Sequence, residues 1–170
     1  MPSCPICRVP HHRLGRRRVM SALAAAPRAI ARVVGHASRR HLARRPARGE
    51  WSAAEVLGHL LDAEVTLGFR IRKLAAEPGA AVVAWDQDRW TDALRHRRAD
   101  ARTLAAAYAA LRVANLEQVR RMSPAQRRAA GRHPEYGRLR VDQILTHWAE
   151  HDLNHIEQMR STLRAVSAAR

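Results

Sequence analysis

Residues 51–74, WSAAEVLGHLLDAEVTLGFRIRKL, predict one long amphipathic helix and set the fold class. Ser52 followed by Glu55 is a capping box, in which two side chains satisfy free backbone N–H groups at a helix start. Pro78-Gly79 ends this helix at about Glu77. Its apolar residues recur every three or four positions and form one inward stripe: Val56, Leu60, Ala63, Leu67, Ile71 and Leu74.

Three further segments show helical spacing, at about Met20 to Leu42, Ala99 to Met122 and Arg140 to Leu163. In the first, the expected inward residues are Leu23, Ile30, Val33 and Val34. In the second, they are Leu104, Tyr108, Leu111, Asn115, Gln118 and Met122. In the third, they are Val141, Ile144, Trp148, Ile156 and Met159.

The predicted fold is therefore all-α, a four-helix bundle in one domain. No window alternates as a half-buried strand does, so we expect no strands, and we expect a loop at 131–137. The long link 78–98 leaves room for a crossover or a short helical turn. We assign 1–19 to a basic, disordered tail, 20–165 to the bundle and 166–170 to a C-terminal tail.

The charge of the chain is concentrated at its N-terminal end. The 170 residues carry a formal net charge of +16, and residues 1–50 hold 12 Arg against one acid. No aromatic residues interleave these arginines, so a stacking platform for single strands is absent and nucleic-acid binding is not favoured. No apolar stretch approaches the roughly 18 residues of a membrane span, so we exclude a transmembrane protein.

The first 20 residues contain two patterns that we set aside. Cys4-Pro5-Ile6-Cys7 with His11 and His12 could bind zinc, but the spacing is too short and adjacent histidines rarely point at one metal. Arg16-Arg17 before a small-residue run resembles an export signal, but the apolar stretch is weak. We interpret Met20 as the true start and the protein as cytoplasmic.

Candidate metal ligands lie on two of the predicted helices. In residues 147–155, HWAEHDLNH, three histidines are spaced by four and stack on one helical face. The apolar seam continues through His151 and His155 and leaves His147 at its flank, and the same spacing places His59 inward on its own helix. Three neutral imidazoles leave one coordination position open, as in catalytic metal sites, and suit zinc, nickel or iron. The alternative is that these rings only pack in the core.

Two short peptidase patterns overlap the same helix. His147-Trp148-Ala149-Glu150-His151 fits H-x-x-E-H, and residues 151–155 resemble H-E-x-x-H with Asp152 in place of Glu. Both need a further ligand downstream, and only 15 residues follow His155. We therefore do not predict a peptidase.

Two motifs resemble those of the DinB/YfiT-like superfamily: GEWSAAEVLGHLLD at 49–62 and HDLNHIEQ at 151–158. The similarity runs from about Met20 to Leu163. It implies a four-helix bundle, often dimeric, that binds a divalent metal through three histidines. Carried over by position, the ligands are His59, His151 and His155, and His147 is left as a pocket residue.

The resemblance also suggests a class of chemistry. Characterised members include thiol S-transferases that use bacillithiol, a mycothiol-dependent maleylpyruvate isomerase and a domain of sulfoxide synthases. We therefore expect a metal-dependent enzyme that transfers a low-molecular-weight thiol or hydrolyses a small molecule. Asp62 and Asp152 are candidates to orient imidazoles or move protons.

Two other hypotheses remain. The first is a non-catalytic metal-binding stress-response module that acts through a homodimer interface. The second is a nucleic-acid partner that acts through the basic residues 8–48.

Overall fold

A computed structural model describes residue 14 and residues 16–168 of the chain. The Cys4 to Cys7 motif with His11 and His12 lies outside the described residues. The long helices are α1 (Arg16–Gly35), α3 (Ala53–Ala76), α5 (Ala101–Arg121) and α7 (Val141–Ala168). The short elements are α2 (Arg39–Ala43), α4 (Gln87–Ala93), the 3₁₀ turn η1 (His96–Arg98), α6 (Pro124–Arg128), β1 (Ala130–His133) and β2 (Gly137–Arg140).

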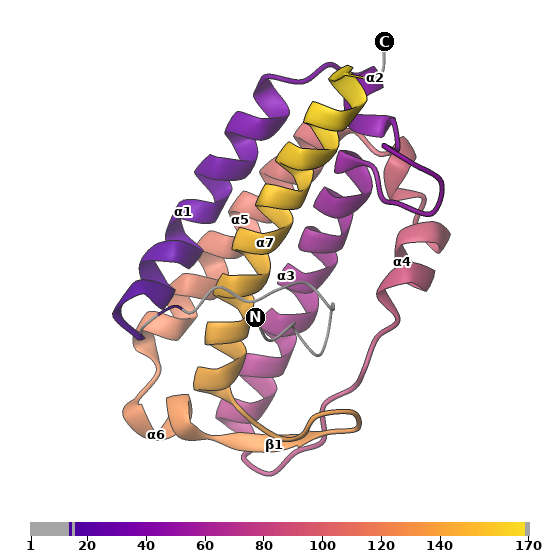
Figure 1. Cartoon of the computed structure of the whole chain (residues 1–170). Coiled ribbons are helices and arrows are strands. Elements are labelled where there is room, and N and C mark those ends of the chain that lie inside the picture. The colour runs from indigo at the N-terminus through magenta and orange to yellow at the C-terminus, as the bar shows by residue number, and fades with distance from the viewer. Residues whose placement is uncertain (1–13, 15, 169–170) are drawn as a thin grey trace.

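The four long helices form the predicted bundle. Helix α7 packs against α1 and α3, and α5 packs against the same two helices from the other side (Figure 1). Helices α3 and α5 run parallel to each other, because the link 78–98 crosses the length of the bundle between them (Figure 1). This crossover carries α4 and η1, both of which contact α3.

The helix boundaries differ from the predicted ones at three places. The predicted helix Met20 to Leu42 is two helices, because Ser38 caps α2 by accepting the N–H of His41 at 3.2 Å. Helix α1 begins at Arg16, so it includes the end of the segment that we assigned to a disordered tail. Helix α7 continues beyond the predicted end at Leu163 and buries Val166.

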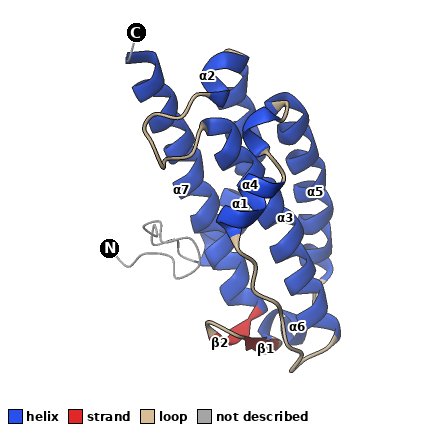
Figure 2. Ribbon diagram, turned by 90° about the vertical axis from the view of Figure 1, so that its right-hand side faces the viewer, coloured by secondary structure: helices blue, strands red, loops and turns tan. Residues whose placement is uncertain are grey.

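The expectation of no strands is wrong. Strands β1 and β2 form an antiparallel hairpin where we predicted a loop (Figure 2). Gly137 turns the chain with a φ of 65°, which glycine adopts without strain. A β-bridge between Ala81 and Arg132 joins the hairpin to the crossover, and a Cβ at Gly131 would lie 2.2 Å from the Ala80 carbonyl oxygen. These strands are only four residues long and depend on tertiary pairing, so they show no alternation in the sequence.

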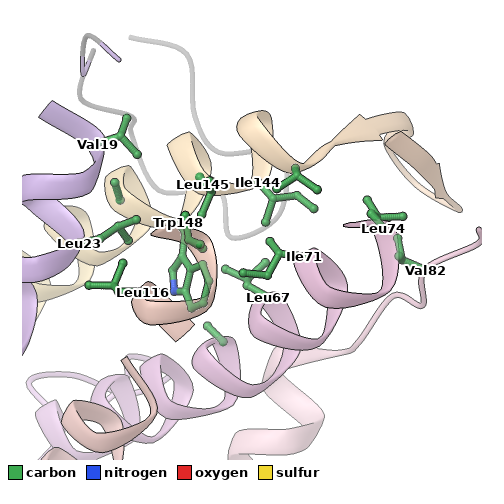
Figure 3. Close-up of a cluster of buried hydrophobic side chains, with 14 residues drawn as sticks. Val19, Leu23, Leu67, Ile71, Leu74, Val82, Leu116, Ile144, Leu145 and Trp148 are labelled. Carbon is green, nitrogen blue, oxygen red and sulfur yellow. The ribbon is translucent and has the colours of Figure 1, made fainter. Parts of the chain in front are cut away.

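Two apolar clusters fill the bundle, one toward each end. The cluster nearer the hairpin surrounds Trp148, with Leu23, Leu67 and Ile144 among its members (Figure 3). The inward stripes predicted for α1, α3 and α7 are buried, and each of their side chains is at most 9% exposed.

The predicted inward seam of α5 is partly wrong. Tyr108 and Asn115 are buried, but Leu111 is 38% exposed. The helix is rotated so that Arg112 faces the interior, together with Leu116 and Val119. Prediction from spacing places charged residues on the outside, so it assigns the wrong inward face to α5. Arg112 can be buried only because Glu64 of α3 and Asp152 of α7 neutralise its charge.

Within the described residues, no helix is long and apolar enough to cross a membrane.

Candidate metal centre

Local structure at the start of α3 sets the position of His59. Ser52 accepts the N–H of Glu55 at 3.3 Å, and Glu55 accepts the N–H of Ser52 at 2.8 Å, so the predicted capping box is present. This box fixes the first turn of α3 at Ala53, and His59 follows on the inward face with its side chain fully buried.

Helix α7 supplies the other two rings of the cluster. His151 and His155 are one turn apart, each 2% exposed, and their ring centroids are 4.3 Å apart. The His59 ring lies 4.9 Å from that of His151 and 4.7 Å from that of His155. One ring nitrogen from each residue lies within 4.8 Å of the others. We call His59, His151 and His155 the histidine triad.

The environment keeps the rings of His59 and His151 neutral. Burial lowers the pKa of His59 well below its usual range, and the nearby His155 adds to the effect. The pKa of His151 falls well below its usual range for the same two reasons. A neutral imidazole offers one lone pair, and the Nε2 atoms of His59 and His151 face each other at 2.9 Å. His155 donates its Nδ1–H to Gln158 Oε1 at 2.6 Å, which leaves Nε2 of His155 as the atom with a lone pair.

The triad fits a divalent metal ion. Two imidazole nitrogens on one tetrahedral zinc lie about 3.3 Å apart, so the spacing of the triad requires only small ring movements. Three nitrogen ligands leave a further position for water or substrate. The buried cluster could therefore bind a metal ion, and its donor set is that of zinc, nickel or ferrous iron.

Tryptophan side chains cover the triad from outside the bundle. Trp85 of the crossover stacks on His59 with centroids 5.3 Å apart and an interplanar angle of 10°. Trp51, just before α3, contacts the same ring at 5.1 Å, and Trp90 packs edge-on against Trp85. The crossover thus removes the His59 ring from solvent, and burial is the largest cause of its low pKa.

Asp62 lies one turn after His59, and its carboxylate bonds His96 of η1. The distance from Asp62 Oδ2 to His96 Nε2 is 2.7 Å, and both residues are buried. The His96 ring lies against Gly58, where an added Cβ would be 2.2 Å from His96 Cγ. Through this contact with His96, Asp62 holds the crossover against α3. A role for Asp62 in proton transfer stays a prediction.

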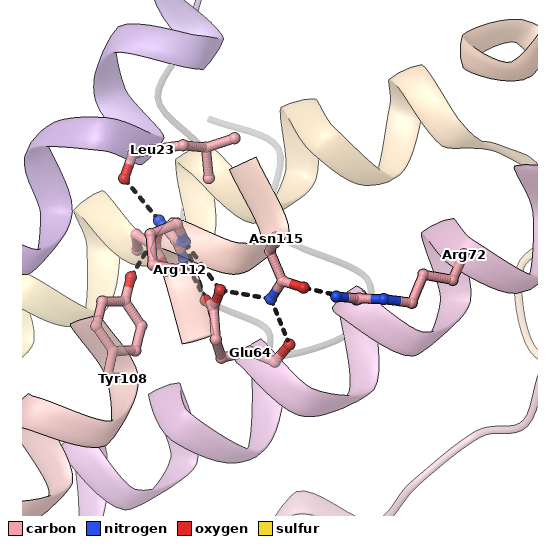
Figure 4. A network of polar contacts seen from close by, with 7 residues as sticks. Leu23, Glu64, Arg72, Tyr108, Arg112 and Asn115 are labelled. Carbon is pink, nitrogen blue, oxygen red and sulfur yellow. Dashed lines mark hydrogen bonds and ion pairs between the residues drawn. The ribbon is translucent and has the colours of Figure 1, made fainter. Parts of the chain in front are cut away.

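A buried polar network surrounds Arg112 in the middle of the bundle (Figure 4), and Asp152 is bound to it. Oδ2 of Asp152 lies 2.7 Å from Arg112 Nη1 and accepts the Tyr108 hydroxyl at 3.0 Å. Arg112 also binds Glu64 of α3 through Nε and Nη2 and donates to the Leu23 carbonyl. Burial raises the pKa of Asp152 and of Glu64, and Arg112 opposes that rise. The structure therefore gives Asp152 partners other than the triad imidazoles, and its catalytic role also stays a prediction.

His147 lies beside the triad, as the spacing predicted. Its ring centroid is 5.5 Å from that of His151. Together with Glu150 it lines a cavity of about 630 Å³ on the hairpin side of the triad. A second cleft, of about 400 Å³, opens beside His155 toward the C-terminal end of α7.

The family follows from a match over most of the chain. Residues 22–159 match the family model of the DinB superfamily. The chain belongs to the DinB superfamily. The resemblance seen in the paired motifs is thereby confirmed. No curated protein matches this DinB-superfamily chain.

A solved structure supports the same fold. YfiT from Bacillus subtilis, described as a probable metal-dependent hydrolase with an unusual four-helix bundle topology, matches with a TM-score of 0.82. The match covers 91% of each chain at 18% sequence identity. At that identity the likeness establishes the fold, and it confirms the predicted bundle.

Sequence reasoning missed several residues around the triad. Trp85 and His96 lie in the crossover, for which we predicted little structure, and Gln158 is a polar residue one turn after His155. The spacing of Gln158 could have revealed it. A side chain three positions after a histidine on a helix can reach the ring nitrogen of that histidine that does not bind metal.

Proposed function

We propose that this protein is a hydrolase of small molecules that depends on a divalent metal ion held by His59, His151 and His155. The observation that carries the proposal is the convergence of three buried ring nitrogens from α3 and α7 beside a cleft. The description of YfiT as a probable metal-dependent hydrolase, on the same fold, supports the proposal.

A metal ion held by His59, His151 and His155 would supply a nucleophilic water near neutral pH and would polarise a substrate carbonyl. The side chains of the chain supply the remaining requirements. Gln158 orients the His155 ring, and Trp85 shields His59 from solvent. Outside the triad, His147 is the histidine whose ring contacts His151 among the described residues. We therefore assign it the transfer of a proton during the reaction.

Transfer of a low-molecular-weight thiol would use the same open position. The described residues include no cysteine, so the sulfur would come from a cosubstrate. A screen with and without added thiol separates the two reactions, because hydrolysis proceeds without it and transfer does not.

Metal content is the first experiment. We expect about one metal ion per chain in the wild type after loading with zinc, nickel or ferrous iron, and loss of that ion in His155→Ala. His36→Ala is the matched control, because His36 is exposed on the bundle surface and its removal should leave the metal content unchanged. Wild-type protein that binds no metal after loading would reject the proposal.

Turnover is the second experiment. We expect the loaded protein to hydrolyse at least one member of a panel of small esters, amides and lactones, and His147→Gln to lower kcat by about 10²-fold while metal content is kept. Metal binding with turnover only in the presence of thiol would replace hydrolysis by thiol transfer.

A further inference from the structure

The cleft beside His155 differs in charge from the protein around it. The chain has 31 basic and 15 acidic residues, yet the described residues that line this cleft include Glu50 and Asp88 and no Lys or Arg. Neither carboxylate forms an ion pair with another described residue. Another cleft that borders α4 shows the contrast, since its lining includes four arginines against two acids: Arg45, Arg95, Arg97 and Arg98 with Glu55 and Asp92.

The neutral groups of the cleft are also suited to a hydrogen-bond donor. Gln87 Oε1 is buried and has no hydrogen-bond partner among the described residues. Gln158 contributes a second amide oxygen, which already accepts from His155. Trp51 lines the same cleft and offers an aromatic ring, which attracts cations.

The position of the cleft connects these groups to the triad. Its lining runs from the segment 46–51 and the start of α4 along α7 from His155 to Ala165, a rise of about 15 Å. A volume of about 400 Å³ is within the range of small-molecule sites. A bound molecule would therefore meet His155 and the two carboxylates within the same cleft.

We propose that the substrate carries a protonated amine, which this cleft binds between Glu50 and Asp88 while the reacting group lies at the triad. The placement of the reacting group rests on the proposed hydrolase function. The preference for an amine rests on the cleft alone. Two carboxylates, a buried amide oxygen and an indole ring favour an ammonium group, and the same carboxylates repel an anionic one.

The test compares three probes that differ only in their terminal group: 3-phenylpropylamine, 3-phenylpropanol and 3-phenylpropanoate. Binding to the full chain is followed by calorimetry and tryptophan fluorescence at pH 7. The protein is kept metal-free with a chelator, so that the amine cannot bind through a metal ion. We expect the amine to bind about tenfold more tightly than the alcohol, and the carboxylate to bind most weakly.

Paired variants assign the preference to the cleft. The Glu50→Gln/Asp88→Asn variant should bring the amine and the alcohol to within about twofold of each other. The Glu77→Gln/Glu117→Gln variant makes the same charge change at exposed positions outside the cleft and should keep the preference. Equal binding of all three probes to the wild type, tighter binding of the carboxylate, or equal loss in both variants would each overturn the proposal.

The outcome is independent of the metal experiment. Amine preference in a protein that never binds metal would uphold the cleft and reject the hydrolase. Metal-dependent turnover without amine preference would do the opposite.

Discussion

Replacing Arg112 by methionine should destabilise the protein strongly. The Arg112 side chain is 1% exposed and contacts two carboxylates, Glu64 and Asp152, which are 0% and 2% exposed. Methionine fills most of the same volume, so the change removes the positive charge and the hydrogen bonds more than the packing. It leaves two buried carboxylates beside each other without a cation.

The magnitude follows from the burial of this network. Removing one partner of a buried ion pair costs about 3–5 kcal/mol, because the remaining charge loses its compensation. Arg112 compensates two carboxylates, so we expect a loss of at least about 4 kcal/mol at pH 7. Typical domains have a free energy of unfolding of about 5–15 kcal/mol, so the variant should be marginally stable.

The loss should depend on pH in a definite direction. Without Arg112, burial is opposed mainly by the hydrogen bonds from Asn115 and Tyr108, so the pKa values of Glu64 and Asp152 in the folded state rise further above their unfolded values. The folded variant then holds more protons than the unfolded chain between about pH 4 and 7, so its stability falls as the pH rises. The difference in unfolding free energy between the wild type and the variant is smallest near pH 4. It widens by up to about 1.4 kcal/mol per pH unit for each carboxyl group.

The assay is urea denaturation of the metal-free protein at pH 4.5 and pH 7. Arg121→Met is the control, because Arg121 pairs with Glu117 on the surface and should cost less than about 1 kcal/mol. The triple variant Arg112→Met/Glu64→Gln/Asp152→Asn should recover at least half of the loss. A loss below about 1 kcal/mol, or one that is equal at both pH values, would refute the argument.

Three further perturbations test the surroundings of the triad. Gly58→Ala places a Cβ against the base of the His96 side chain, and we expect a loss of about 1–3 kcal/mol in urea denaturation; wild-type stability would show that η1 moves freely. Ser52→Ala removes half of the capping box and the hydrogen bond to the Glu55 carboxylate, so it should lower stability by about 1 kcal/mol in urea denaturation. Unchanged stability would contradict the capping role of Ser52. Burial depresses the pKa of His59 and His151, so the unfolded chain takes up protons first as the pH falls below about 6.5. Metal-free protein should therefore lose up to about 1.4 kcal/mol per pH unit per ring between pH 6.5 and 5, and His59→Asn should show a smaller slope.

Much of the site could be read from the sequence because its residues repeat at helical spacing. His151 and His155 share a face with Trp148 and Ile156, and His59 shares one with Val56 and Ala63, so burial of the rings follows from the apolar seams. The distance between the two helices does not follow from those seams. Packing of α3 against α7 brings the rings within 4.8 Å.

The aspartates show where spacing arguments stop. Asp62 and Asp152 each lie within one turn of a triad histidine, which suggested contact with the imidazoles. Their partners, His96 and Arg112, come from η1 and α5. A carboxylate binds the strongest donor within reach, and which donor is within reach is a property of the packed helices.

By itself, the sequence determined the helical class, the core stripes of α1, α3 and α7, and the inward direction of the three histidines, because local spacing and capping act within one segment. Only the tertiary structure decided the burial of Arg112 on α5, the hairpin β1–β2 and the tryptophan cover that the crossover lays over His59. Each of these depends on groups far apart in the chain. A buried charge, a short strand and a stacked ring are stable only when a partner from another segment is held against them.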